Sequence, residues 1–213
     1  MIKTIKKNLE TKLPGIRSWN RMAVKPLNDI NKTIIKYEDL LANDKISKMK
    51  QAAVLVCFFK KEDEYYLPLI KRPIHEKNHP GQIALPGGSR EENETLEITA
   101  LREAFEEVGI IPDNVDIIGE MTPLPVPVSN YLISPFIGMT EKEPEWNLNK
   151  QEVDELIIVK FKELISSDNG YYEKWKLNES TLKVPIFKIM NKKIWGATAA
   201  VLSELIDLSR DIN

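Results

Sequence analysis

The sequence has only one cysteine, Cys57, and only two histidines among its 213 residues. A disulfide within the chain is therefore impossible, and a lone thiol in the apolar run 52–59 suits a reducing compartment. We interpret Cys57 as a small core side chain. No apolar run approaches the roughly 20 residues that a membrane-spanning helix needs. The basic N-terminus also lacks the apolar stretch of a secretory signal, so we expect a cytoplasmic protein.

The chain also lacks an excess of charge of either sign, since its formal net charge is −2. We therefore expect neither nucleic acid nor a membrane as a partner, and local cations would have to hold an anionic substrate. The length favours one enlarged domain over residues 1–213. Within it we expect an N-terminal extension with a helix at 1–50 and a core, including the C-terminal helix, at 51–213. Monomer and homodimer both stay open.

Strand and helix patterns interleave along the chain, which predicts an α/β or α+β sandwich with a mixed central sheet. The continuous apolar run 52–59 predicts a central strand buried on both faces. Further strands are expected at 65–72, 115–120, 131–139, 155–161, 182–189 and 193–195. Helices are expected at 2–13, near 37–41, at 94–108 and at 197–209. In the last helix we expect one apolar face, formed by Ala200, Val201, Leu205 and Leu208.

The expected helix 94–108 carries an unfavourable group of acids. Glu103, Glu106 and Glu107 stand at i, i+3 and i+4, so their carboxylates should converge on one side. Like charges at these spacings repel by roughly 0.2–0.5 kcal/mol per pair, and we expect no basic residue four positions away to relieve them. A divalent cation would relieve the group, although a solvated acidic face is the alternative. The apolar face expected to pack on the sheet consists of Ile98, Leu101, Ala104, Phe105 and Val108.

These acids belong to a longer pattern: Gly, five residues, Glu, seven residues, Arg-Glu, an aliphatic residue, any residue, Glu-Glu, any residue, Gly and an aliphatic residue. The pattern resembles the Nudix box of the Nudix hydrolases, and Ala104 takes the first aliphatic place. Its fixed places are filled by Gly88, Glu94, Arg102, Glu103, Glu106, Glu107, Gly109 and Ile110. The resemblance implies an α/β/α sandwich with a loop-helix-loop metal site for Mg²⁺ or Mn²⁺.

The resemblance also implies roles for individual residues. Glu103, Glu106 and Glu107 should bind the metal, with Glu103 and Glu106 counted as catalytic through it. Glu94 and Arg102 should hold the loop and the helix in register. Gly109 is a natural helix stop.

The segment before the box resembles the signature of the coenzyme A pyrophosphatases. It matches at Leu69, Arg72, Gly81, Gln82, Pro86, Gly87 and Gly88. It departs where Ile70 stands for Thr, Lys77 for a second Arg and Leu85 for Phe, and Lys77 lacks the forked geometry of arginine. The resemblance implies that the substrate is bound by Arg72, Lys77, His79, Gly87 and Gly88.

The implied reaction is attack of water on the diphosphate of coenzyme A, which gives 4′-phosphopantetheine and 3′,5′-ADP. Cations must neutralise the phosphate oxygens, and a carboxylate serves as general base. Glu152 is our first candidate for that base and Glu155 the second, although both also fit as ordinary acids beside a strand. A substrate such as ADP-ribose, a dinucleoside polyphosphate or a nucleoside triphosphate is the alternative. A nucleotide-sensing module without activity is a second alternative.

Overall fold

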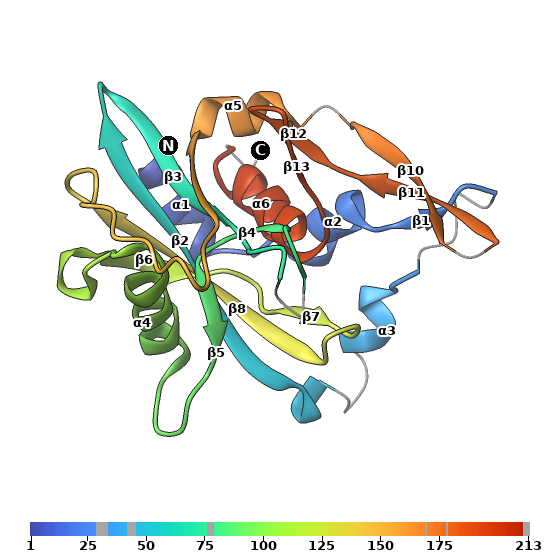
Figure 1. Cartoon of the computed structure of the whole chain (residues 1–213), viewed down its shortest axis with the longest axis horizontal. Coiled ribbons are helices and arrows are strands. Elements are labelled where there is room, and N and C mark those ends of the chain that lie inside the picture. Colours follow the sequence, from blue (N-terminus) through green and yellow to red (C-terminus); the bar gives the residue numbers. More distant parts are fainter. Residues whose placement is uncertain (29–33, 42–45, 76–78, 169, 178, 211–213) are drawn as a thin grey trace. The chain divides into compact units, whose positions relative to one another are not determined.

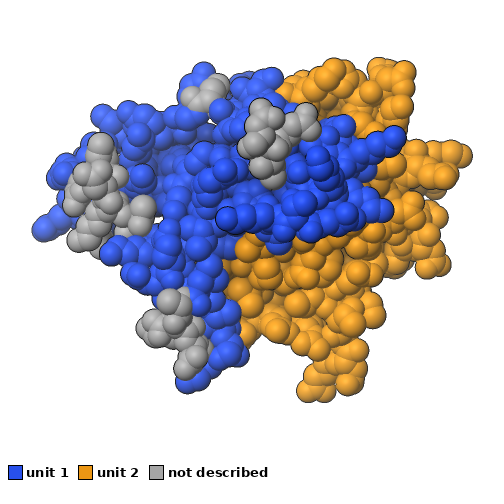
Figure 2. Space-filling model, turned by 180° about the vertical axis from the view of Figure 1, so that it is seen from behind, with its two compact units in different colours: residues 1–48, 164–213 blue, residues 49–163 orange. Residues whose placement is uncertain are grey.

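The computed structural model describes residues 1–28, 34–41, 46–75, 79–168, 170–177 and 179–210 (Figure 1). The chain forms two compact units, one of residues 49–163 and one of residues 1–48 and 164–213 (Figure 2). The expectation of a single domain over 1–213 stays a prediction. No helix in the described ranges has the length and apolar character needed to cross a membrane.

Residues 49–163 fold around a sheet of eight strands. Its centre is β2 (Lys50–Lys61), which runs parallel to β8 (Tyr131–Thr140). The other pairings are antiparallel and involve β3 (Glu64–Lys71), β4 (Ile83–Ala84), β5 (Gly87–Ser89), β6 (Asp116–Glu120), β7 (Leu124–Val126) and β9 (Glu155–Lys160). The apolar run of β2 is buried, as its composition predicts. This mixed sheet, with helix α4 packed on it, confirms the predicted α+β architecture (Figure 1).

The sheet takes its shape from how β2 changes partners along its length. Its last residues form a hairpin with β3, and the two turn residues Glu62 and Asp63 have φ values of 50° and 62°. Positive φ at both positions gives a turn whose twist suits a two-residue hairpin. The first half of β2 pairs instead with the short strand β5. The glycine-rich segment 87–88 therefore lies against the centre of the sheet.

Helix α4 (Leu96–Val108) begins two residues later than predicted, because the side chain of Thr95 caps it by accepting a hydrogen bond from the Ile98 backbone N–H. The predicted apolar face is wrong at two positions, since Ile98 and Phe105 are each 51% exposed. The buried residues of the helix are Thr99, Ala100, Ala104, Glu107 and Val108. We attribute this orientation to the two alanines, whose small side chains let the helix approach β2 closely.

The other unit contains the N-terminal and C-terminal parts of the chain. One sheet has the order β1 (Lys25–Pro26), β11 (Ser180–Pro185) and β10 (Tyr172–Leu177), and β12 (Phe187–Ile189) pairs with β13 (Lys192–Ile194). The predicted strand 182–189 is thus divided at Ile186, whose N–H donates to the Tyr171 carbonyl. The helices are α1 (Ile2–Leu9), α2 (Ile16–Trp19), α3 (Tyr37–Leu41) and α6 (Gly196–Leu208). The 3₁₀ segments are η1 (Asn20–Met22) and η2 (Ile46–Lys48), with η3 (Pro112–Asn114) in the sheet unit, and α5 (Phe161–Ser166) contains the boundary between the units.

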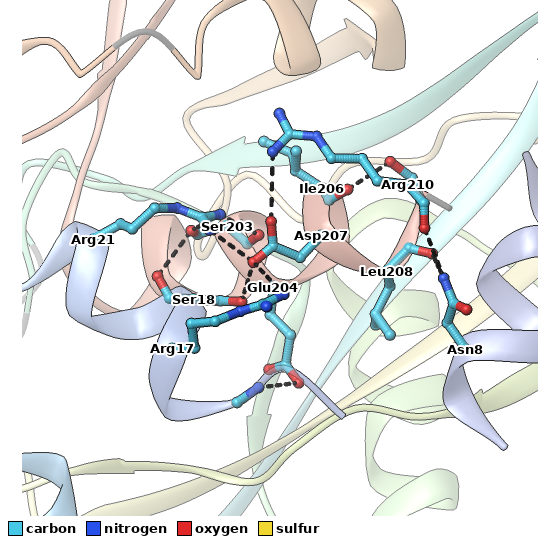
Figure 3. A network of polar contacts seen from close by, with 12 residues as sticks. Asn8, Arg17, Ser18, Arg21, Ser203, Glu204, Ile206, Asp207, Leu208 and Arg210 are labelled. Carbon is cyan, nitrogen blue, oxygen red and sulfur yellow. Dashed lines mark hydrogen bonds and ion pairs between the residues drawn. The ribbon is translucent and has the colours of Figure 1, made fainter. Parts of the chain in front are cut away.

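Helix α1 ends at Leu9 rather than near residue 13, with Thr11 Oγ1 bonded to the Asn8 carbonyl just beyond its end. The four residues of the predicted apolar face of α6 are buried, but burial is not limited to one face, because Ser203, Glu204 and Asp207 are buried as well. Trp19 Nε1 donates to Glu204 at 3.0 Å, and the other buried polar groups have partners on the N-terminal segment (Figure 3). Burial of these polar groups is tolerable because each is hydrogen-bonded.

Candidate metal and diphosphate site

Two glycines at β5 let the chain approach the sheet and the acidic helix. Gly87 has φ of +153°, and a Cβ there would lie 2.3 Å from the Ala53 carbonyl oxygen. A Cβ on Gly88 would lie 2.5 Å from Oε1 of Glu103. Both predicted glycines are therefore positions where a side chain would collide, and the Glu103 carboxylate packs directly against the Gly88 backbone.

Arg102 lies at the centre of the acidic group. Its Nη1 donates to Glu103 Oε1 at 3.0 Å and to Glu106 Oε2 at 2.9 Å. The expectation that no cation four residues away relieves the acids is therefore wrong, because Arg102 and Glu106 form an i, i+4 ion pair. The planar guanidinium group has several donors, so it can also hydrogen-bond to the preceding loop. These additional bonds hold it in a position where it reaches both acids.

That loop is held by Glu94. Arg102 Nε donates to Glu94 Oε1 at 2.7 Å, and Arg102 Nη2 donates to the Ser89 carbonyl at 3.1 Å. Thr99 Oγ1 also donates to Glu94 Oε2. The hydrogen bond from Arg102 lowers the pKa of Glu94 to about 2. The contacts thus connect the loop to the helix, as the proposed register role of Glu94 and Arg102 requires.

Glu107 is the buried member of the acidic group, with 3% of its surface exposed. The Gly87 N–H donates to Glu107 Oε2 at 2.9 Å. Burial raises the pKa of Glu107 to about 8, the Gly87 hydrogen bond opposes that rise, and the charges of Glu103 and Glu152 add to it. Burial likewise raises the pKa of Glu103, against the lowering effect of Arg102. The site therefore holds two carboxyls whose charged forms are disfavoured in the protein alone.

Glu152 lies on a loop that is bonded to the end of α4. The N–H of Asn147 donates to the Val108 carbonyl at 3.1 Å, and the N–H of Asn149 donates to the Glu107 carbonyl at 3.0 Å. Gly109 ends the helix with φ of +83°, and a Cβ there would lie 2.8 Å from Asn147 N. The charge of Glu152 raises the pKa of both Glu103 and Glu107. Sequence reasoning missed Asn147 and Asn149, because their backbone bonds leave no mark in the sequence.

Of the predicted substrate-binding residues, Arg72 directly follows β3, His79 lies in the loop before β4, and Gly87 and Gly88 lie in β5. The charge of Arg72 lowers the pKa of Glu107, and the Arg72 N–H donates to the Gln82 carbonyl at 2.9 Å. His79 has φ of +56°, is exposed, and its Nδ1 lies 3.0 Å from Gln82 Oε1. Lys77 lies outside the described residues. Glu155 stands opposite Lys71, at the start of β9.

The donor set fits a hard divalent cation, since it consists of carboxylates, one of them buried. In the described part of the chain, however, no three His, Cys, Asp or Glu side chains are arranged as the ligands of one ion. The three carboxylates do not converge as predicted. Glu103 and Glu106 instead accept hydrogen bonds from Arg102, and Glu107 accepts one from the Gly87 N–H. The ligand set therefore stays a proposal.

Comparisons with known proteins identify the family of this chain. The profile of the NUDIX domain matches residues 49–179. The chain is 32% identical over 161 residues to the Nudix hydrolase NudL of Pectobacterium atrosepticum, with 75% of this chain and 83% of NudL covered. It is 31% identical over 165 residues to Nudix hydrolase 15, mitochondrial, of Arabidopsis thaliana, with 73% and 57% covered.

Among solved structures, the Nudix hydrolase RenU of M. smegmatis has a TM-score of 0.55 and 17% identity, with 78% of this chain and 90% of RenU covered. This likeness shows the fold alone. The family profile spans more than half of the chain, and the acidic helix follows the Nudix box residue by residue. The chain therefore belongs to the Nudix hydrolase family and is an enzyme of that family.

Proposed function

We propose that the enzyme hydrolyses the diphosphate of coenzyme A or its derivatives to 4′-phosphopantetheine and 3′,5′-ADP. One observation carries the metal-dependent chemistry of this proposal. Glu107 is buried with an elevated pKa beneath the Gly87–Gly88 turn, and Glu103 and Glu106 lie on the same helical turn. A protein keeps such carboxyls at a cost in stability unless a cation or a proton compensates them.

We propose that Glu103, Glu106 and Glu107 hold Mg²⁺ or Mn²⁺. The bound cation would neutralise charge on the phosphate oxygens and acidify a bound water. Glu107 must lose its proton to act as a ligand, so its elevated pKa couples metal binding to pH. Arg102 must share Glu103 and Glu106 with the cation, while its bonds to Glu94 and Ser89 keep it in place.

Glu152 is our candidate for the general base that takes the proton of the attacking water. This assignment is supported by electrostatics, because the charge of Glu152 raises the pKa of both Glu103 and Glu107. The role is also supported by the loop that carries Glu152, because backbone hydrogen bonds fix this loop to the end of α4. Glu155 is the second candidate, and its charge acts on Lys71 instead.

Arg72 is our candidate for the cation that binds the diphosphate, because its charge acts on Glu107. Arginine recognises phosphate through paired hydrogen bonds. His79, Gly87 and Gly88 would complete the contacts by resemblance to the coenzyme A pyrophosphatases, together with Lys77. The choice of coenzyme A rests on that signature. We further propose a small-molecule substrate, a cytoplasmic location, and a monomer or homodimer without nucleic-acid or membrane partners.

The test is a panel of coenzyme A, acyl-coenzyme A, ADP-ribose and NADH with Mg²⁺ or Mn²⁺, in which product masses are identified. We expect coenzyme A or an acyl form to have the highest kcat/KM. A kcat/KM for ADP-ribose that is tenfold or more higher than for coenzyme A would overturn the proposed substrate, but not the proposed metal-dependent hydrolysis. Saturable binding of these compounds with turnover of none of them would identify a sensing module instead. Glu106→Gln serves as the inactive control.

A further inference from the structure

Three lysines stand in one row across the small sheet of β1, β11 and β10. Lys183 is paired with Lys25 on one side and with Lys174 on the other. Directly opposed residues in a sheet share a face, and like charges in that arrangement destabilise it. The opposite face carries Leu182 and Trp175, which pack in the core with Val184 and Ile186. The lysines therefore occupy the outer face of this sheet.

No acid neutralises this row within the described ranges. Glu173 points to the other face of β10 and pairs with Lys193 at 2.9 Å. Lys183 lies over the ring of Tyr172, with its Nζ 4.1 Å from the ring centroid. The sheet thus presents a row of ammonium groups together with an aromatic ring.

Lys183, the central lysine of the row, lines a pocket of about 320 Å³ within the same unit. Tyr172 and Lys183 line it from the sheet, and Arg21, Asp168, Tyr171 and Arg210 line it from the segments around it. Its titratable groups are three cations, one carboxylate and two tyrosines. The carboxylate, Asp168, pairs with Arg210 at 3.1 Å. Apolar side chains, among them Phe187 and Ile186, form much of the remaining wall.

The two arginines of the pocket, Arg21 and Arg210, both form ion pairs with the buried Asp207 (Figure 3). Arg21 Nη1 lies 2.7 Å from Asp207 Oδ2, and Arg210 Nη1 lies 3.5 Å from Asp207 Oδ1. Arg21 Nη2 also donates to the carbonyl and the hydroxyl of Ser203. Groups that are already ordered lose little freedom when a ligand binds. The pocket therefore combines two arginines that are already ordered by carboxylates with two exposed tyrosines, Tyr171 and Tyr172.

We propose that this pocket and the lysine row bind a nucleoside polyphosphate, with the phosphates on Lys183 and the arginines and the base against Tyr171 and Tyr172. Several phosphates are needed to engage a row of cations that extends beyond the pocket. A base explains the aromatic and apolar wall, which inorganic phosphate would leave unused. All lining residues of this pocket belong to the unit of residues 1–48 and 164–213, whereas the acidic helix belongs to the unit of residues 49–163.

The experiment is calorimetric titration of the full chain with ATP in EDTA, where the proposed metal site has no cation. Lys183→Gln and Arg210→Gln test the pocket, and Lys7→Gln, an exposed lysine on α1, is the matched control. We expect saturable binding that Lys183→Gln and Arg210→Gln each weaken at least fivefold and Lys7→Gln changes less than twofold. We also expect Lys183→Gln to keep or raise Tm without ligand, because it removes repulsion within the row.

Five results would overturn the proposal. Absence of saturable ATP binding would do so, as would binding that Lys183→Gln leaves unchanged. If inorganic triphosphate bound as tightly as ATP, the nucleobase would contribute nothing to binding. A short single-stranded RNA that binds far more tightly than ATP would assign the surface to nucleic acid instead. A fall in Tm of Lys183→Gln that matches the loss of binding would indicate a structural role for the lysine.

Discussion

The backbone N–H of Gly87 donates to Oε2 of Glu107 at 2.9 Å, although the residues lie 20 positions apart. The bond exists because Gly87 can adopt φ of +153° against β2, where a side chain would meet the Ala53 carbonyl. One N–H only partly offsets the burial of Glu107, whose pKa stays at about 8. The Gly87–Gly88 turn and helix α4 are therefore joined by this hydrogen bond. The bond explains why glycines and glutamates occur together in the motif.

The two neighbouring glycines should respond differently to substitution by alanine. Gly87→Ala forces a Cβ onto the backbone of β2, so we expect a loss on the order of 3 kcal/mol in the free energy of unfolding. Gly88→Ala meets only the movable carboxylate of Glu103, so we expect near-normal stability with at least tenfold lower kcat. Urea denaturation and steady-state kinetics measure both. Normal activity of Gly88→Ala would show that the position of the Glu103 carboxylate does not matter for turnover.

Glu107 should make the metal-free protein less stable as pH rises. Its pKa in the folded state, about 8, lies above the ordinary value of 4.5, so the folded state binds the extra proton. The free energy of unfolding should then fall from about pH 4.5 to pH 8, by at most roughly 1.4 kcal/mol per pH unit. Glu107→Gln should abolish most of this fall, and the exposed Glu97→Gln should keep it. Urea denaturation in EDTA at several pH values measures it, and the same slope in all three proteins would contradict the assignment.

Glu106→Gln should remove nearly all turnover and leave the fold intact. Glu106 is about half exposed, and its ion pair with Arg102 contributes little to stability. Its role in our account is to bind the cation that acts in the transition state. Turnover of coenzyme A with saturating Mg²⁺ is the measurement, and Tm is the control. A variant within about tenfold of wild type, a difference of only ~1.4 kcal/mol, would refute this role.

Glu152→Gln should lower kcat by about 10² or more with little change in KM, as expected for loss of a general base. Glu155→Gln is the matched control, since it lies at the start of β9 opposite Lys71, and we expect its kcat to stay within about threefold. Single-turnover rates over a range of pH separate the chemical step from product release. If Glu155→Gln shows the larger loss, the two assignments must be exchanged.

The sequence predicted the elements that are continuous and apolar. The run 52–59 lies inside β2, and the acidic helix ends at Gly109 as its pattern requires. Short strands such as β4, β5 and β7 were missed because two or three residues have no periodicity of their own. They exist because neighbouring strands supply the pairing.

Within the candidate site, the motif predicted that Glu94 and Arg102 lie together, but not how the charges of the acidic group are distributed. Arg102 was assigned to Glu94, yet it also binds Glu103 and Glu106, which depends on the loop that orients it. The face of α4 was misjudged because Ile98 and Phe105 are apolar but exposed. On α6, buried Glu204 and Asp207 depend on donors nearly 190 residues away, which no local pattern reveals.

The central claim is that the acidic group on α4 binds the divalent cation on which hydrolysis depends. The most direct measurement is the rate of coenzyme A cleavage after complete chelation and again after Mg²⁺ or Mn²⁺ is restored, with product masses recorded. We predict no cleavage in EDTA and full recovery of 4′-phosphopantetheine and 3′,5′-ADP with metal. Cleavage that continues at the wild-type rate without metal would contradict the account.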